Sequence, residues 1–314
     1  MELLELRGVG KAFKEAQILK NVDIIIEEGD ILGVIGQSGG GKTTLLNLIT
    51  GFIEPSEGEI LYYSKAYNEK RDLNENLHKI KRFFGFTPQH NSFYPKLTVK
   101  ENLLHFGRLY DLDEATLNTN IKNLLQFTRL SDQQHKIADQ LSGGMQKRLD
   151  ISCSLVHKPK ILILDEPTAD LDPILQKEIL HLLQEVNKQG VTIIIASHQL
   201  DSIEQTCNKV AIVHGGTIQC HGLLDDIRNP PAQDHFTISI SADEKEQIMN
   251  RLKTYPIKKI IERGNSLVIY PADAERTMAR VLSLVKSDHL KLHTMHLRKQ
   301  SLSDVFEKIV HDQQ

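Results

Sequence analysis

The chain has 314 residues, enough for two domains, with 40% hydrophobic and 25% charged residues, as in ordinary soluble globular proteins. Its formal net charge of −3 argues against nucleic acid as the main partner, because binding to phosphates needs a basic excess. The three cysteines include no C-x-x-C pair, which favours a reduced, intracellular chain. No apolar run approaches the roughly 20 residues that span a bilayer, so a membrane-spanning part would belong to another chain.

Strand-like and helix-like segments alternate through the first two thirds of the sequence, which predicts an α/β domain with a largely parallel sheet. Apolar strands are expected at 31–35, 161–164 and 191–196. The segment from 91 to 140 is polar with helical periodicity, and Thr98 to Glu101 resembles a capping box at the start of a helix. We therefore interpret residues from about 91 to 145 as a helical subdomain inserted in the sheet domain.

A break at 228–234, containing Asn229, Pro230 and Pro231, predicts a boundary between a first domain of residues 1–228 and a second of residues 235–314. The second domain is expected to have the order β-α-β-β-α-β followed by a helix, which predicts a small α+β module of the ferredoxin-like type. Its predicted strands and helices lie at 236–240, 242–253, 257–262, 267–270, 272–286, 290–297 and 302–311. We expect this module to regulate the protein or to support a dimer, and not to take part in catalysis.

The segment 36–43 is GQSGGGKT and matches the phosphate-loop pattern G-x-x-x-x-G-K-[ST], between a predicted strand and a helical run. Backbone N–H groups of such a loop form an anion nest, and the helix N-terminus adds a positive dipole end. Lys42 would reach the β- and γ-phosphates of a nucleotide, and the Thr43 hydroxyl would hold Mg²⁺. The residues expected to contact the nucleotide here are Gly36, Ser38, Gly39, Gly40, Gly41, Lys42, Thr43 and Thr44.

Two carboxylates, Asp165 and Glu166, follow the predicted strand at 161–164. Because side chains alternate along a strand, the two should face different directions. This suits two roles: Asp165 would hold Mg²⁺, directly or through water, and Glu166 would orient and deprotonate an attacking water. Alone, the pair could equally mark a solvated acidic turn, but its position downstream of a phosphate loop favours the catalytic interpretation.

The segment 141–148, LSGGMQKR, lies between the phosphate loop and the acidic strand and resembles the signature motif of ABC ATPases. The resemblance covers essentially residues 1–228, with every motif in the family's order. It implies a P-loop NTPase fold of the ABC type, ATP hydrolysis, and ATP and Mg²⁺ as cofactors. It also implies a head-to-tail dimer with a second copy of the chain, in which Ser142, Gly143 and Gly144 of one subunit complete the ATP site of the other.

The resemblance assigns roles to further residues. Gln89 resembles the Q-loop glutamine that senses Mg²⁺ and the γ-phosphate, and His198 resembles the switch histidine that contacts the γ-phosphate. Asp172 belongs to a segment that is similar to the D-loop. Phe13 lies where the family places an aromatic residue that stacks on adenine, although it could instead pack in the core. Two positions depart from the family's pattern, Met145 in the signature motif and Asp170 in the D-loop segment.

The residues from 144 to 148 and the SLSDVF segment at 301–306 are similar to the ATPases of prokaryotic drug, lipid, polysaccharide and sodium exporters. This implies a cytoplasmic ATPase, peripheral on the inner face of the cell membrane, that powers a separate transmembrane permease subunit. We expect the segment 93–101 to form part of the socket for that subunit. The alternative is a soluble ABC ATPase in a non-transport role such as cofactor assembly. A kinase or GTPase with the same phosphate loop would not explain the signature segment and His198.

Overall fold

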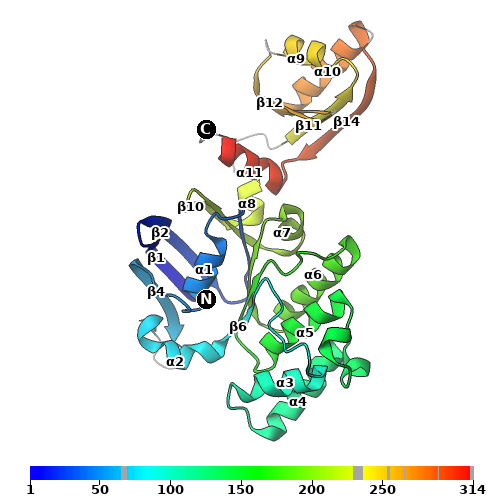
Figure 1. The fold of residues 1–314 in the computed structure, drawn as a ribbon. Helices are drawn as coiled ribbons and strands as arrows, with labels where there is room; N and C mark the ends of the chain where they lie inside the picture. Colours follow the sequence, from blue (N-terminus) through cyan, green and yellow to red (C-terminus); the bar gives the residue numbers. More distant parts are fainter. Residues whose placement is uncertain (65–68, 229–235, 253–254, 265, 289, 312–314) are drawn as a thin grey trace. The chain divides into compact units, whose positions relative to one another are not determined.

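The computed structural model describes the whole chain except residues 65–68, 229–235, 253–254, 265, 289 and 312–314 (Figure 1). It forms two compact units, Met1–Leu223 and Leu224–Gln314. The predicted Pro-Pro break at 229–231 lies outside the described residues. The first unit ends at residue 223, five residues before the expected residue 228. The reason is that the short helix α8 (Leu224–Arg228) packs against helix α11 (Leu302–His311) of the second unit.

A six-stranded sheet forms the centre of the first unit, in the order β10-β9-β3-β8-β7-β6. All its neighbouring strands run parallel except the antiparallel pair β9 and β10, which confirms the predicted largely parallel sheet. Strands β3, β7 and β8 are buried along their whole length, as expected for apolar strands covered on both faces. The strands are β3 (Ile31–Gly36), β6 (Phe84–Thr87), β7 (Ile161–Asp165), β8 (Thr192–Ser197), β9 (Lys209–His214) and β10 (Thr217–Leu223).

A second, antiparallel sheet in the order β2-β1-β4-β5 shares a core with the central sheet. Helix α1 (Lys42–Ile49) contacts strands of both sheets, and its buried Leu45 and Leu46 pack in the common core. This packing fixes the start of α1 at the end of β3, where the phosphate loop lies. The strands of the second sheet are β1 (Glu2–Phe13), β2 (Ala16–Glu27), β4 (Glu57–Ser64) and β5 (Glu69–Asp72).

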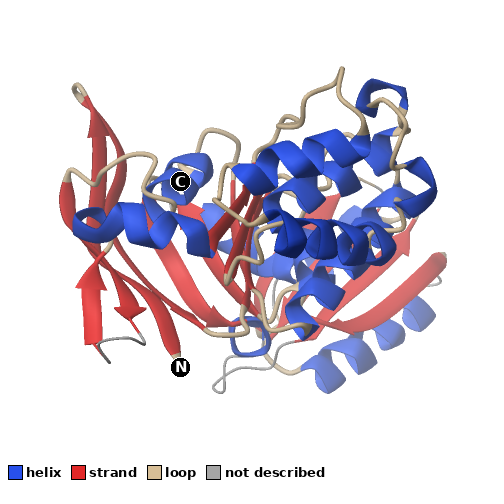
Figure 2. Cartoon of the chain, turned by 90° about the horizontal axis from the view of Figure 1, so that it is seen from below, coloured by secondary structure: helices blue, strands red, loops and turns tan. Residues whose placement is uncertain are grey.

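The helical subdomain consists mainly of α3 (Val99–Arg108), α4 (Glu114–Phe127) and α5 (Gly143–Leu155). Figure 2 colours the helices of the chain blue and its strands red. The predicted capping box is present, since Thr98 and Glu101 exchange side-chain and backbone hydrogen bonds. The subdomain was expected to end near residue 145, which is too early. Its apolar core continues along α5 to Val156, because that helix turns its apolar side toward α3 and α4. The other helices of this unit are α2 (Leu77–Ile80), α6 (Pro173–Lys188) and α7 (Leu200–Thr206).

The second unit contains a four-stranded antiparallel sheet in the order β12-β13-β11-β14. Its elements follow the expected β-α-β-β-α-β order plus a final helix, although the first long helix begins three residues later than expected because β11 extends to Ala242. Apolar residues of the sheet, α9 and α10 form its core. The elements are α8 (Leu224–Arg228), β11 (Phe236–Ala242), α9 (Lys245–Leu252), β12 (Ile257–Arg263), β13 (Ser266–Pro271), α10 (Ala274–Ser287), β14 (Leu292–Lys299) and α11 (Leu302–His311).

A fully buried carboxylate, Asp304, holds the first turn of α11 against the sheet of the second unit. One of its oxygens accepts hydrogen bonds from the backbone N–H (2.9 Å) and hydroxyl (2.8 Å) of Ser301. The other accepts from the Tyr270 hydroxyl (3.3 Å) and from Arg298 (3.0 Å). Asp304 therefore links α11 to strands β13 and β14.

Among the described helices of the chain, none is long and apolar enough to cross a membrane.

Candidate nucleotide site

A cavity of about 420 Å³ opens beside the phosphate loop and the carboxyl end of β7. Eleven of its twelve lining residues belong to the site predicted from the sequence. The exception is Ile18 of β2, which lies within an ordinary run of alternating strand residues and so gave no signal of a site. The twelve residues are Phe13, Ile18, Ser38, Gly39, Gly41, Lys42, Thr43, Thr44, Gln89, Asp165, Glu166 and His198.

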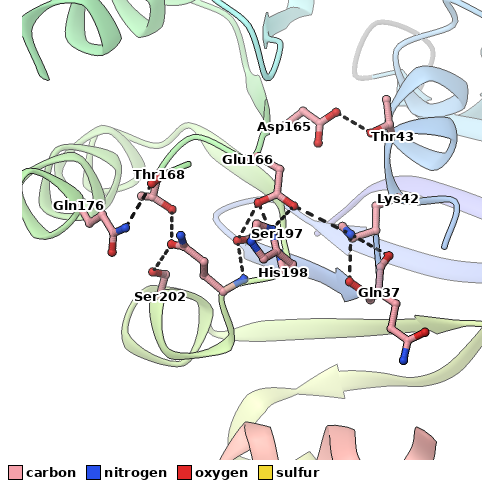
Figure 3. Close-up of polar contacts among 12 residues, drawn as sticks. Gln37, Lys42, Thr43, Asp165, Glu166, Thr168, Gln176, Ser197, His198 and Ser202 are labelled. Atoms are coloured by element: carbon pink, nitrogen blue, oxygen red, sulfur yellow. Dashed lines mark hydrogen bonds and ion pairs between the residues drawn. The ribbon is translucent and has the colours of Figure 1, made fainter. Parts of the chain in front are cut away.

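The phosphate loop connects β3 to α1 and depends on glycine for its shape. Gly39 and Gly41 have φ angles of 76° and 98°, a left-handed region that residues with a Cβ atom avoid. Gly41 is also the N-cap of α1. The Lys42 side chain is buried, and its Nζ atom donates to the carbonyl oxygens of Gly36 (2.9 Å) and Gln37 (3.1 Å). The buried Lys42 side chain thus folds back onto the start of its own loop (Figure 3).

Thr43 and Asp165 place two oxygen ligands side by side. The Thr43 hydroxyl at the start of α1 donates to Asp165 Oδ2 at the end of β7, at 2.7 Å. Burial raises the pKa of Asp165, and the neighbouring Glu166 carboxylate raises it further, whereas the hydrogen bond from Thr43 and the charge of Lys42 lower it. A hydroxyl and a carboxylate at this spacing suit Mg²⁺, which usually takes one or two carboxylates and completes its shell with substrate phosphates and water.

Asp165 and Glu166 contact different partners, as predicted, although Glu166 lies just beyond the end of β7 and both side chains line the cavity. The backbone of Glu166 adopts φ 48° and its N–H donates to the carbonyl of Ala196 in β8 (2.9 Å). Its Oε1 atom lies 2.9 Å from His198 Nδ1 and 3.9 Å from Lys42 Nζ. Because a carboxylate can only accept, the His198 ring must carry its proton on Nδ1 in this contact. The buried Glu166 carboxylate thus lies between a cation and an imidazole (Figure 3).

A chain of hydrogen bonds continues from Glu166 to the D-loop segment, through residues that the sequence did not single out (Figure 3). Glu166 Oε2 accepts from the Ser197 hydroxyl (3.2 Å), which in turn accepts from the backbone N–H of Gln199 (3.0 Å). The Gln199 side chain accepts from Thr168 Oγ1 (3.0 Å). The Gln176 side chain of α6 in turn donates to the backbone carbonyl oxygens of Thr168 (3.3 Å) and of residue 171 (2.9 Å). The spacing of these residues along the chain matches no motif, so the sequence alone did not indicate this network.

Phe13, Gln89 and His198 lie at the rim of the cavity. Phe13 is 47% exposed, which excludes the alternative that it packs in the core, and Lys11 Nζ lies 5.1 Å from its ring centroid. Gln89 is exposed in the loop after β6, and the His198 side chain is 58% exposed. An aromatic ring, an amide and an imidazole are therefore all accessible to a ligand in the cavity.

The signature segment and Asp172 do not line this cavity in their own chain. Ser142 is the N-cap of α5, and its hydroxyl accepts from the Met145 N–H at 3.4 Å. Gly143 is exposed, whereas Gly144 is buried against Leu175. Asp172 is the N-cap of α6, and its carboxylate accepts from two backbone N–H groups of that helix, at 2.9 and 3.0 Å. Its side chain therefore already has a structural partner.

Known proteins are similar to the chain in both sequence and fold. The family model described as ABC transporter matches residues 19–169. Over 310 residues, the chain is 30% identical to the uncharacterized ABC transporter ATP-binding protein YxlF of Bacillus subtilis (strain 168), covering 98% of this chain and 100% of the relative. The chain belongs to the family of ABC transporter ATP-binding proteins. The family predicted from the signature segment is confirmed.

Further relatives of this ABC transporter ATP-binding protein differ in their named roles. The linearmycin resistance ATP-binding protein LnrL of Bacillus subtilis (strain 168) is 25% identical over 97% of both chains. The methionine import ATP-binding protein MetN of Clostridioides difficile (strain 630) is 36% identical over 72% of this chain and 70% of the relative. A dimeric ATP-binding cassette, MJ0796, solved in a post-hydrolysis state with ADP and Pi, matches with a TM-score of 0.61 and 29% identity, covering 71% of this chain and 99% of the other. The chain is thus an ABC ATPase and the ATP-binding subunit of a transporter.

Proposed function

We propose that this subunit binds ATP and Mg²⁺ in the cavity beside the phosphate loop and hydrolyses ATP with Glu166 as the general base. The observation that carries this proposal is the position of the Glu166 carboxylate, 3.9 Å from Lys42 Nζ and 2.9 Å from His198 Nδ1. It places a proton acceptor beside the cation that would bind the transferred phosphate. The Thr43 and Asp165 oxygens lie in the same cavity.

Each residue would make a separate contribution to hydrolysis. Lys42 would exchange its two carbonyl contacts for oxygens of the β- and γ-phosphates, which offer stronger charge-assisted hydrogen bonds. Thr43 and Asp165 would hold Mg²⁺, with Gln89 approaching from the rim, and the bound ion would neutralise charge on the phosphate oxygens. Glu166 would take a proton from the attacking water. His198 would keep the Glu166 carboxylate oriented through its Nδ1–H and would reach the γ-phosphate from the rim.

A head-to-tail dimer would complete the site. Ser142 and Gly143 are exposed at the start of α5, outside the cavity of their own chain. A helix N-terminus with an exposed hydroxyl and free N–H groups binds anions well, so this end of α5 could contact the γ-phosphate held by a second copy. The dimeric structure of the similar cassette MJ0796 supports pairing of two such domains. Asp172 would lie close to the nucleotide only in such a dimer, since it does not line the cavity of its own chain.

The subunit would act on the inner face of the cell membrane, with a transmembrane permease bound near the segment 93–101. An exposed aromatic side chain there supports a docking role: Tyr94 is 49% exposed, and its ring contacts His105 of α3 at a centroid distance of 4.6 Å. Lys96, 85% exposed, pairs with Asp139 at 3.3 Å. Such a mixture of aromatic and charged groups is typical of protein interfaces.

Export is favoured over import by the extent of the alignments. YxlF and LnrL align with nearly the whole chain, including the second unit, whereas MetN proteins align with 72–83% of it. The relative with a resistance role therefore shares the architecture of this chain more fully than the relative with an import role. The alternative of a soluble ATPase in cofactor assembly receives no support from the names of these relatives.

Glu166→Gln tests the proposed base. The amide keeps the shape of the side chain but cannot take a proton, so the turnover rate should fall by about 10²–10⁴ while ATP affinity is kept. The ATP-bound dimer should then accumulate and be measurable by analytical ultracentrifugation. Glu185→Gln, on the exposed side of α6, is the matched control and should hydrolyse ATP normally. Near-normal single-turnover hydrolysis by Glu166→Gln would remove Glu166 from the role, and a variant that binds ATP but stays monomeric would contradict the dimer.

A further inference from the structure

Helix α5 carries a stripe of polar side chains that are buried instead of exposed. Lys147, Asp150 and Ser154 are spaced at i, i+3 and i+7, which places them on one side of the helix, and their exposed fractions are 6%, 0% and 6%. Leu149 and Cys153 of the same helix pack in the apolar core of the helical subdomain. Burying a carboxylate without strong partners is costly, so a polar stripe at this place needs a reason.

Asp150 fixes the segment that follows Gln89. Its Oδ1 atom accepts two hydrogen bonds from Ser92, one from the backbone N–H at 2.8 Å and one from the hydroxyl at 2.6 Å. Its Oδ2 atom has no hydrogen-bond partner among the described residues but lies 3.6 Å from Lys147 Nζ. The charge of Lys147 thus compensates the buried carboxylate, while the carboxylate holds Ser92 by both of its donors.

Ser154, one turn further along α5, fixes the segment that precedes Gln89. Its hydroxyl donates to the carbonyl oxygen of Phe86 at 2.8 Å and lies 2.9 Å from the hydroxyl of Thr87, which is fully buried. Only residues 88–91 lie between Thr87 and Ser92. The loop that carries Gln89 into the nucleotide cavity is therefore attached at both ends to one side of α5.

The same helix begins at the signature segment. Ser142 caps α5, and Asp150 lies eight residues further along it, about 12 Å at the usual rise of a helix. A helix of this length moves as a rigid body, so the position of Ser142 is linked to that of Gln89 through Asp150 and Ser92. The two groups would contact nucleotides in different sites of a dimer.

We propose that Asp150 is a positioning residue that fixes the Gln89 loop on the signature helix, so that Gln89 and Ser142 move together when nucleotide binds. This inference rests on the proposed role of Gln89 at the Mg²⁺ and γ-phosphate site. The buried carboxylate does not touch the nucleotide. It acts through Ser92, and its loss leaves the loop free to hold Gln89 at the wrong distance from the cavity.

A double-mutant cycle on the full chain tests the proposal by steady-state ATPase kinetics. Gln89→Ala and Asp150→Ala are each expected to lower kcat by about tenfold or more, with the KM for ATP changed by less than about threefold. In the Gln89→Ala background, Asp150→Ala should change kcat by less than about twofold, because the group through which it acts is gone. Asp150→Asn keeps the oxygen that accepts from Ser92 and should restore most of kcat.

A control separates positioning from a general loss of packing. Asn120→Ala removes another buried polar side chain of the helical subdomain, whose Nδ2 atom donates to the carbonyl oxygen of Val156 at 3.0 Å. It should lower thermal stability and leave the kinetic effect of Gln89→Ala unchanged. If Asp150→Ala does not fold, Ser92→Ala removes the hydroxyl donor alone and should give a smaller fall in kcat that also disappears in the Gln89→Ala background.

Two outcomes would overturn the proposal. Asp150→Ala could lower kcat by the same factor with and without Gln89, which would mean that the residue only supports the fold. It could also leave kcat unchanged although Gln89→Ala lowers it, which would mean that the loop needs no such anchor. A Gln89→Ala variant with wild-type kcat is a different failure, because it would refute the proposed role of Gln89 itself and with it the basis of this inference.

Discussion

The half-buried imidazole of His157 should make the stability of the first unit depend on pH. His157 follows α5, and its Nε2 atom lies 3.0 Å from the carbonyl oxygen of Phe84. Its ring is stacked on Tyr110, with a centroid distance of 3.6 Å and an angle of 5° between the planes. Burial lowers the pKa of His157 from 6.5 to about 4, although the hydrogen bond to Phe84 opposes the shift. The folded protein therefore keeps this ring neutral at pH values where the unfolded chain protonates it.

The direction and size of the effect follow from this difference in pKa. Between pH 6.5 and about 4 the unfolded state binds more protons, so the contribution of His157 to stability is complete above pH 6.5 and is lost as the pH falls to about 4. Lowering the pH from 7 to 5 should reduce the free energy of unfolding by about 2 kcal/mol through this residue. His157→Gln cannot titrate, although its amide can still donate to the Phe84 carbonyl, and it should lack this part of the pH dependence.

Urea unfolding of the nucleotide-free protein at several pH values measures the difference. The free energy of unfolding of the wild-type chain should fall by about 2 kcal/mol more than that of His157→Gln between pH 7 and pH 5. Other histidines titrate in both proteins and cancel in the comparison. Equal losses in the two proteins would refute the reasoning, because His157 would then have the same pKa in the folded and unfolded states.

Three further predictions concern the signature segment, the metal site and the second unit. A Cβ atom at Gly143 would meet nothing within 4 Å, whereas one at Gly144 would lie 2.7 Å from a methyl of Leu175. Thermal unfolding should therefore show that Gly143→Ala is as stable as the wild type and that Gly144→Ala is less stable. Both variants should lose ATPase activity. Thr43→Val should raise the Mg²⁺ concentration for half-maximal ATPase activity by about tenfold or more, as measured by Mg²⁺ titration. Asp304→Ala should destabilise the second unit by about 1–3 kcal/mol in urea unfolding and leave ATP affinity unchanged in equilibrium titration, because it removes the shared acceptor of hydrogen bonds from Ser301, Tyr270 and Arg298.

The nucleotide site was largely predictable from the sequence because its chemistry fixes both residue types and spacing. A phosphate loop needs glycine where the backbone is left-handed, as at Gly39 and Gly41, and a Lys and a hydroxyl directly after it. Two consecutive carboxylates after a buried strand can serve two partners, as Asp165 does with Thr43 and Glu166 with His198. These constraints act over a few consecutive residues and therefore leave a pattern in the chain.

The residues that support the site were not predictable, because they act between segments far apart in the sequence. Asp150 and Ser92 are separated by 58 positions, and nothing in their neighbours marks either one. The residue pattern of α5 also gives no sign that Asp150 holds another segment, since Leu149 and Asp150 are both buried, on different sides of the helix. For the same reason the helical subdomain was expected to end near residue 145, before the apolar residues that continue its core.

The boundary between the two units shows a similar limit. Prolines at 230 and 231 predict a break in regular structure, but they do not tell with which unit the preceding helix packs. Leu224 of α8 is buried, and Arg228 Nε donates to the carbonyl oxygen of Gln300 at 3.2 Å, just before α11. Only the three-dimensional contacts assign α8 to the second unit.

The backbone of Glu166 implies that the chain gives up some stability at the position of its proposed base. A residue with a Cβ atom costs about 1–2 kcal/mol in the left-handed region, and Glu166 is held there by its hydrogen bond to Ala196. Glycine at this position would relieve that strain and asparagine would reduce it, but neither could act as a base. With Glu166 as the proposed base, selection for heat resistance alone would favour its loss, and its retention would depend on selection for hydrolysis.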